Sequence, residues 1–313
     1  MVKPFFNRLL GIRLRVAEKT ILAFFAALLI ASLTLSLPGT TLGVLAGLNV
    51  MVGWLVLALS KDDLVERSRM ALPIRDWLPA LLMLLAYRES GLFIKADPAH
   101  RLDRLFTLLD RTMLHSRWVE GLLYSCAPWP QHYLEMCYLL CYPLVPLGFA
   151  ALYLARPSVA AQREPRGRGL EADLYHEPLH ITVMFDKFWT AVLLAALFCY
   201  AIYPFFPLTP PRVLFNDVPG PPVPPLLRNM NLWVLDRLSV QACLFPSAHA
   251  AAVTATALAV RAHMPRLGIL FCIAALSVAV ATVYGRYHYA ADAVAGVLVG
   301  AMAFVVTRRI HKA

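Results

Sequence analysis

The sequence predicts an all-α integral membrane protein, built as a helical bundle of about eight transmembrane helices of roughly 20 residues each. Hydrophobic residues make up 59% of the 313 positions, and the mean hydropathy is +0.62. Both values lie far outside the composition of soluble globular proteins. The net charge of +10 comes from Lys and Arg in the loops. There they orient the chain and meet anionic lipid headgroups, so the charge predicts no nucleic-acid partner.

The first 60 residues predict a basic N-terminus followed by a helical hairpin. Apolar runs at 20–37 and 41–60 flank a turn at Pro38 and Gly39. No small-x-small cleavage site follows the first run, which favours a retained hairpin over a signal peptide. We therefore expect two units, residues 1–60 and a membrane core at 61–313. The second unit begins with a charged cytoplasmic segment that runs to about residue 75.

The middle of the chain mixes spans with surface segments. Residues 77–94 reach membrane length only by including charged residues, whereas 133–155 and 188–206 are clear spans. Apolar and charged residues alternate at helical spacing over 97–118, a pattern typical of a helix lying on the membrane surface or of an amphipathic connector. Residues 207–246 are rich in Pro and predict a stiff, extended loop.

Two polar stretches interrupt the apolar C-terminal third. The first reads FPSAH at 245–249 and the second reads GRYHYAAD at 285–292. Apolar runs at about 248–263, 267–285 and 289–307 surround them. Because the first two runs form an antiparallel pair, both polar stretches lie on the same side of the membrane.

These stretches hold the groups of a phosphoryl-transfer site. His288 and Asp292 are four residues apart, so on a helix they share a face and can hydrogen-bond, which fixes the orientation of the imidazole. Ser247 is placed to cap the following helix, whose free N–H groups are a natural seat for phosphate, with His249 beside it. Ionisable groups at membrane depth are costly and usually functional, which favours a site over a buried structural histidine.

The motifs PSxH at 246–249 and HxxxD at 288–292 carry a family resemblance. They look like the second and third signature motifs of the type-2 phosphatidic acid phosphatase superfamily, over roughly residues 76–308. The form RYHYxxD, with Pro-Pro-Arg upstream, most resembles its inositol phosphorylceramide synthase-like branch. The usual first motif, KxxxxxxRP, is absent, and Thr282 stands where the third motif normally begins with Arg. The resemblance implies a six-helix lipid-phosphatase-type core and an outward-facing site.

The chemistry of the residues and the resemblance assign the same catalytic roles. His288 attacks phosphorus and forms a phosphohistidine, while Asp292 orients the ring and stabilises its positive charge. His249 protonates the leaving oxygen and then activates the acceptor. A metal site made of His249, His288 and Asp292 is the alternative, since two His and a carboxylate can bind iron or zinc. The phosphoryl-transfer scheme requires no metal and no other cofactor.

Phosphate binding is expected from Ser247 and from arginines, because charge on the transferring group needs cations. Arg212 directly follows a span and enters the loop leading to Ser247. Arg286 lies two residues before His288, where a helix ending would free its side chain. Arg228 and Arg237 are weaker candidates in the same loop.

The remaining polar and aromatic residues of these loops receive structural roles. Tyr287 and Tyr289 are predicted as aromatic anchors at the membrane interface. Cys126 and Cys243 fall in loops, where a disulfide between them is the alternative to free thiols.

The sequence predicts a membrane lipid phosphatase acting on a lipid phosphate monoester or diphosphate. The alternative is a phosphoalcohol transferase of the inositol phosphorylceramide synthase type, in which a lipid hydroxyl replaces water. A non-catalytic scaffold or transporter would have no need of the two histidines and the aspartate together. The expected partners are the lipid phosphate substrate and the bilayer. Composition suggests a bacterial inner membrane, and the charges of the short loops favour both termini inside and the site on the extracytoplasmic side.

Overall fold

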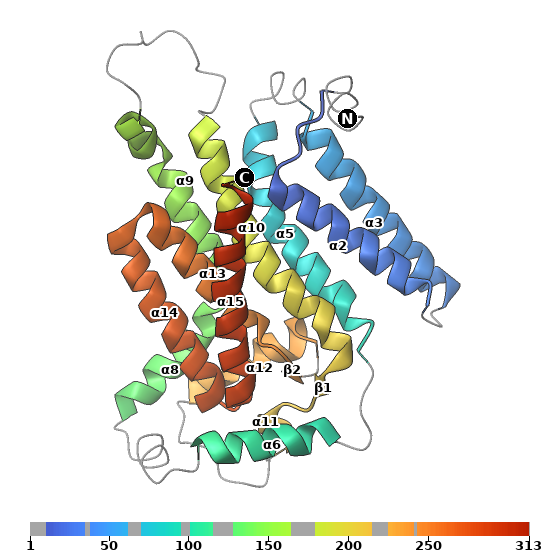
Figure 1. Ribbon diagram of the computed structural model, residues 1–313. Coiled ribbons are helices and arrows are strands. Elements are labelled where there is room, and N and C mark those ends of the chain that lie inside the picture. The colour runs from blue at the N-terminus through green and yellow to red at the C-terminus, as the bar shows by residue number, and fades with distance from the viewer. Residues whose placement is uncertain are drawn as a thin grey trace.

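Long helices of the computed structural model run side by side as a bundle, and the short elements gather at one end (Figure 1). The structure describes residues 11–34, 38–61, 70–94, 101–114, 128–163, 179–214, 225–240 and 243–312. The bundle helices are α2 (Val16–Ser32), α3 (Gly39–Leu59), α5 (Ala71–Gly91), α9 (Leu144–Arg163), α10 (Leu179–Ile202), α13 (Ala248–His263), α14 (Pro265–Tyr284) and α15 (Ala290–Ile310). The remaining elements are α6 (Arg101–Leu114), α8 (Pro128–Leu140), η1 (Tyr203–Phe205), β1 (Pro207–Leu208), α11 (Pro211–Leu214), α12 (Pro225–Leu238) and β2 (Cys243–Leu244).

Several of these helices support a multi-pass membrane protein. Among the described residues, α3, α10 continued through η1, α14 and α15 are each long and apolar enough to cross a membrane. Helices α8 and α9 meet the same criterion together, which brings the number from four to five. The predicted count of about eight spans is not confirmed. With 17 and 16 residues, α2 and α13 are shorter than a typical span, and α5 carries charged residues at both ends.

The predicted span at 133–155 is not one straight helix. The chain bends by 70° between α8 and α9. Residues 141–143 form the turn, and Pro143 stands just before α9, where its missing N–H leaves the helical hydrogen-bond ladder interrupted. The bend directs Tyr138 and Tyr142 toward the ring of His249, at centroid distances of 6.2 and 5.4 Å.

The predicted extended loop at 207–246 is also wrong in part, because it contains secondary structure. Strand β1 pairs with β2 in antiparallel register, with Pro207 opposite Leu244. The 14-residue helix α12 lies between them and begins at Pro225. Proline is favoured at the first position of a helix, and none follows it within α12. The Pro-rich composition therefore marks the start of a helix here.

At the end of the bundle opposite the short elements, buried charged residues join the helices. Arg15 pairs with Asp76 and Arg75 with Glu18, each at 2.6 Å, which joins the start of α2 to α5. Asp186 of α10 accepts hydrogen bonds from the first N–H groups of α2, at 3.0 and 2.8 Å. Arg75, predicted at the end of a cytoplasmic segment, therefore lies buried within α5, which begins earlier than the predicted span at 77–94.

Helix α13 lies at the centre of the core, and its small residues allow neighbouring helices to approach closely. Gly296 and Gly300 of α15 face the backbone of α13. A Cβ at Gly296 would lie 2.4 Å from the carbonyl oxygen of Ser247, and one at Gly300 would lie 2.4 Å from that of Ala251. This small-xxx-small spacing is a common helix-packing device in membranes. It brings the first turns of α13 and α15 together.

Candidate active site

Helix α13 begins as the sequence predicts, with Ser247 as its N-cap. The Ser247 Oγ accepts a hydrogen bond from the N–H of Ala250 at 3.4 Å. The N–H of Ser247 itself donates to the carbonyl oxygen of Asp292 at 3.3 Å, which connects the two polar loops. His249 follows in the first turn of α13.

The second polar loop is a tight turn between α14 and α15. Arg286 adopts a positive φ of 57°, a conformation that is strained for a residue with a side chain and is often retained at functional sites. The N–H groups of Tyr287 and His288 both donate to the carbonyl oxygen of Thr282, each at 2.9 Å. This turn reverses the chain directly before His288.

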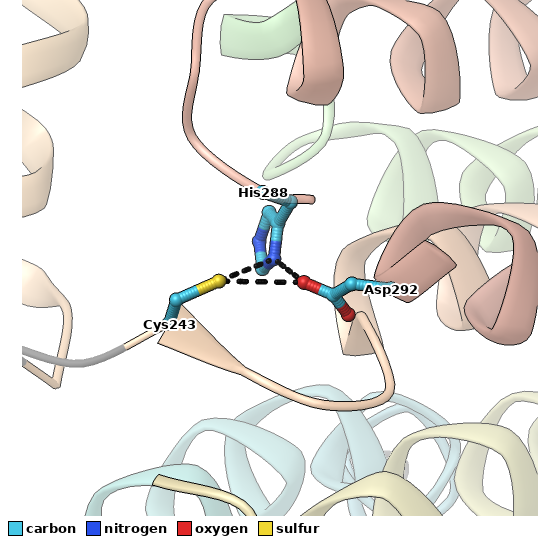
Figure 2. A group of neighbouring side chains, drawn as sticks. All are labelled: Cys243, His288 and Asp292. Carbon is cyan, nitrogen blue, oxygen red and sulfur yellow. Dashed lines mark hydrogen bonds and ion pairs between the residues drawn. The ribbon is translucent and has the colours of Figure 1, made fainter. Parts of the chain in front are cut away.

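His288 and Asp292 do not share one helix, contrary to the prediction, because His288 precedes α15 and Asp292 lies in its first turn. They nevertheless meet: the Nδ1 of His288 lies 2.5 Å from the Oδ2 of Asp292 (Figure 2). A carboxylate is an acceptor, so it holds the proton on Nδ1 and leaves the lone pair of the ring on Nε2. The Asp292 side chain is fully buried and the His288 side chain is 10% exposed.

A cavity of about 650 Å³ extends from this pair into the bundle. His249, His288 and Arg212 lie along its wall, and the two imidazole rings are 5.8 Å apart between centroids. The rest of the wall is mainly aliphatic and aromatic, and its tyrosines are Tyr87, Tyr138, Tyr142, Tyr200, Tyr203 and Tyr287. The wall of one largely apolar chamber thus includes a base or nucleophile, a second histidine and a cation.

A family model of the PAP2 superfamily matches residues 179–306. The matched segment runs from α10 into α15 and contains both polar loops. It supports the PAP2 superfamily, as the motifs predicted, and indicates an enzyme of phosphatase or phosphotransferase type. The search of curated proteins returned no match, and neither did the search of solved structures.

The structure brings together some of the residues expected to form a PAP2 superfamily site and leaves others apart. His249, His288 and Arg212 share the cavity, and Asp292 contacts His288. Ser247 is fully buried, and its side chain is not part of the cavity wall. The Arg286 side chain is also not part of the cavity wall, although the carbonyl oxygen of Arg286 accepts the N–H of Arg212 at 2.9 Å. Phosphate binding by these groups stays a prediction.

Cys243 was not expected at this position. Its Sγ lies 3.4 Å from the Oδ2 of Asp292 and 3.5 Å from the Nδ1 of His288 (Figure 2). Burial raises the pKa of the Cys243 thiol, and the neighbouring Asp292 carboxylate raises it further, so the neutral thiol donates to that carboxylate. The predicted alternative, a disulfide with Cys126, cannot be compared because Cys126 lies outside the described residues; Cys243 is a free thiol.

Tyr287 and Tyr289 are buried, so their prediction as interfacial anchors is wrong. The Tyr287 hydroxyl donates to the Oε2 of Glu135 at 2.6 Å, and its ring stacks on Tyr138 with centroids 3.6 Å apart. The Tyr289 hydroxyl donates to the carbonyl oxygen of Thr209 at 3.1 Å. These hydrogen bonds therefore fix the backbone on both sides of His288.

Glu135 is the centre of a buried network behind the catalytic turn. Asn231 of α12 donates to its Oε2 at 2.7 Å, and Arg228 lies 3.2 Å from its Oε1. Arg228 also donates to the carbonyl oxygen of Gly285 at 2.6 Å and lies over the Tyr287 ring. Arg228 thus supports the turn, and Glu135 joins it to α8 and α12. No local sequence pattern marks Glu135, because its partners come from distant segments.

Replacing Glu135 with Ala should impair both stability and catalysis. The change leaves Arg228, Asn231 and Tyr287 without their shared acceptor, and breaking a buried ion pair costs about 3–5 kcal/mol. We expect a lower melting temperature in detergent and, at a temperature where the protein is still folded, a lower kcat. The matched control is Glu18→Ala, which breaks a buried ion pair with Arg75 at the far end of the bundle. It should lower stability similarly and leave kcat unchanged. Equal kcat values for the two variants would exclude the positioning role.

Helix α6 lies across the end of the bundle that carries the site (Figure 1), which confirms a helix within the predicted 97–118 segment. Its place on a membrane surface stays a prediction. Asp110 accepts the N–H of Ala290 at 2.8 Å and so caps α15 from another segment, while Asp103 accepts the N–H of Thr209 at 2.7 Å. Burial raises the pKa of Asp110 to about 6, although its bonds to N–H groups of α15 oppose this shift. Two carboxylates of one helix therefore hold the loops that carry Arg212 and His288.

Proposed function

We propose that the protein is a membrane lipid phosphatase that hydrolyses a lipid phosphate monoester or diphosphate through a phosphohistidine on His288. One observation carries the proposal. A histidine whose Nδ1 is held by Asp292 shares the wall of an apolar cavity with His249 and Arg212. The match of the PAP2 superfamily model to this segment supports the same reaction type.

The reaction proceeds in two displacements. The Nε2 of His288 attacks phosphorus, the bond from phosphorus to the ester oxygen breaks, and His249 gives a proton to the leaving oxygen. Asp292 stabilises the positive charge on the imidazole, and Arg212 faces the charge on the phosphoryl oxygens. His249 then takes a proton from water, whose oxygen attacks phosphorus as the bond from nitrogen to phosphorus breaks. The products are inorganic phosphate and either the lipid alcohol, from a monoester, or the lipid monophosphate, from a diphosphate.

The walls of the cavity support a lipid substrate. They are formed largely by apolar side chains of α5, α8, α10 and α12, so an acyl or prenyl chain can lie among them while the phosphate meets the histidines. We assign α5, α8 with α9, α10, α13, α14 and α15 to the six-helix core at 61–313, and α2 with α3 to the N-terminal hairpin. The loops of the site lie opposite the end where α15 stops at two arginines, which supports an extracytoplasmic site in an inner membrane.

A phosphoalcohol transferase is the second candidate, because Arg212 of the Pro-Pro-Arg sequence lines the same cavity. In that reaction a lipid hydroxyl takes the place of water, and a substituted phosphoryl group such as phosphoinositol moves to it. The catalytic residues and their roles are otherwise the same.

Substrate turnover distinguishes these reactions. Protein purified in detergent is incubated with lipid phosphates, prenyl diphosphates and phosphoinositol lipids, with and without ceramide or diacylglycerol, while free phosphate and new lipids are measured. We expect free phosphate from the wild type and none from His288→Ala. A new phosphorylated lipid without free phosphate would instead identify the transferase. Equal inactivity of wild type and variant across the panel would reject both reactions.

A further inference from the structure

We propose that Cys243, His288 and Asp292 form an inhibitory binding site for a thiophilic divalent cation, with Zn²⁺ as the best match. One donor atom of each residue, a sulfur, a nitrogen and an oxygen, lies within 4.8 Å of the other two, and all three residues are buried. Cys243 comes from β2, His288 from the loop before α15 and Asp292 from α15, and the three side chains point toward one another (Figure 2). Borderline-soft Zn²⁺ accepts this mixed set of thiolate, imidazole and carboxylate ligands.

The distances among the donor atoms are close to those of a tetrahedral zinc centre. With Zn–S near ~2.3 Å and Zn–N and Zn–O near ~2.0 Å, the sulfur lies about 3.5 Å from each of the other two donors. In the structure, the Cys243 Sγ lies 3.5 Å from the His288 Nδ1 and 3.4 Å from the Asp292 Oδ2. Two of the three donor separations thus already match.

To fit a tetrahedral zinc centre, the distance from the His288 Nδ1 to the Asp292 Oδ2 must lengthen, and the surroundings permit this change. The Nδ1 of His288 and the Oδ2 of Asp292 are 2.5 Å apart because they share a proton. Replacing that proton with a cation lengthens this distance by roughly 1 Å. The other carboxylate oxygen of Asp292 is buried and has no hydrogen-bond partner among the described residues, so the carboxylate can turn without losing another bond.

This site differs from the metal triad considered from the sequence, which used His249 in place of Cys243. His249 lies on the cavity side of His288, with ring centroids 5.8 Å apart, and does not belong to the close group of donors. Within the part of the chain that the structure describes, only the thiol completes a set of donors with the Nδ1 of His288. The Nε2 atom takes no part in this set of donors, and the proposed reaction uses it.

Cation binding would block the proposed reaction. The Cys243 thiol releases a proton to solvent as it becomes a ligand. The ring proton of His288 leaves Nδ1, which binds the cation, and Nε2 takes up a proton in its place, so the imidazole stays neutral; a water molecule supplies the fourth ligand. Asp292 then no longer accepts the Nδ1 proton, and the bound cation withdraws electron density from the ring. The Nε2 atom of His288 then carries the ring proton and has no lone pair with which to attack phosphorus, so the inhibition does not require the cation to compete with lipid for the cavity.

Zn²⁺ titration of the purified protein tests the inhibition. Free Zn²⁺ is set with a chelator buffer, and the activity of each variant is normalised to its own activity without metal. We expect Cys243→Ser and Cys243→Ala to need roughly 100-fold more Zn²⁺ for half-inhibition, because each loses a direct ligand. Cys199→Ala, which removes another buried thiol in α10, is the matched control and should behave as wild type. Equal sensitivity of wild type and Cys243→Ala would overturn the proposal.

Two measurements are independent of catalysis and so separate this proposal from the proposed function. Co²⁺ loaded into the wild type should give a thiolate-to-cobalt charge-transfer band and the visible absorption of tetrahedral cobalt. Zn²⁺ should also protect Cys243 from alkylation, measured by peptide mass spectrometry on the wild type, which keeps the test valid if the variants fail to fold. Absence of the thiolate band together with unprotected Cys243 would reject the site, whatever reaction the protein catalyses.

Discussion

Replacing His288 with Ala should abolish both turnover and formation of a phosphoenzyme. Its Nε2 is the proposed nucleophile, and loss of a nucleophile that acts with partner groups lowers kcat by roughly 10⁴-fold or more. The measurement is rapid-quench labelling with ³²P-labelled substrate, followed by a test for the acid-labile, base-stable bond of phosphohistidine. The wild type should carry the label on His288, and the variant should carry none.

His249→Ala completes this test, because it removes the proton donor and keeps the nucleophile. With p-nitrophenyl phosphate, whose leaving group needs no proton, the phosphoenzyme should still form and then accumulate, since water is no longer activated. His263→Ala, at the opposite end of α13, serves as the control and should keep wild-type kinetics. Labelling of another residue, or substantial turnover by His288→Ala, would contradict the assigned roles.

Replacing Gly296 with Ala should separate the two catalytic loops. The added Cβ would meet the Ser247 carbonyl oxygen at 2.4 Å and the Ala250 Cβ at 2.9 Å, and neither belongs to a flexible side-chain end. Helices α13 and α15 must then move apart, at a cost of about 1–3 kcal/mol. Because Asp292 lies one helical turn before Gly296, the displacement also moves the Asp292 carboxylate and His288 relative to His249. We expect a lower melting temperature and at least a tenfold lower kcat.

The same substitution at Gly47 of α3 provides the matched control. A Cβ there meets no heavy atom within 4 Å among the described residues, so only the intrinsic preference for Ala over Gly in a helix, up to about 1 kcal/mol, should appear. Thermal unfolding in detergent and initial rates would be measured for both variants. A Gly296→Ala protein with the stability and kcat of Gly47→Ala would show that close packing of α13 on α15 does not hold the site together.

The sequence by itself determined what depends on composition and on short spacings. Hydropathy predicted a helical membrane protein, and the motifs around Ser247 and His288 predicted the superfamily that the family model supports. The four-residue spacing of His288 and Asp292 predicted their hydrogen bond, and Ser247 was correctly predicted as a helix cap. These features are local, because a few bonds of backbone fix the relative positions of the side chains that form them.

Only the tertiary structure decided which distant side chains complete the site. Cys243 contacts His288 across 45 positions, Glu135 reaches Tyr287 across 152, and Asp110 caps α15 across 180. The break before α9 and the helix after Pro225 position several of these partners, and neither followed from hydropathy or proline content. Such contacts arise where helices pack closely, and close packing depends on small residues such as Gly296. No local sequence pattern encodes which backbone Gly296 will contact.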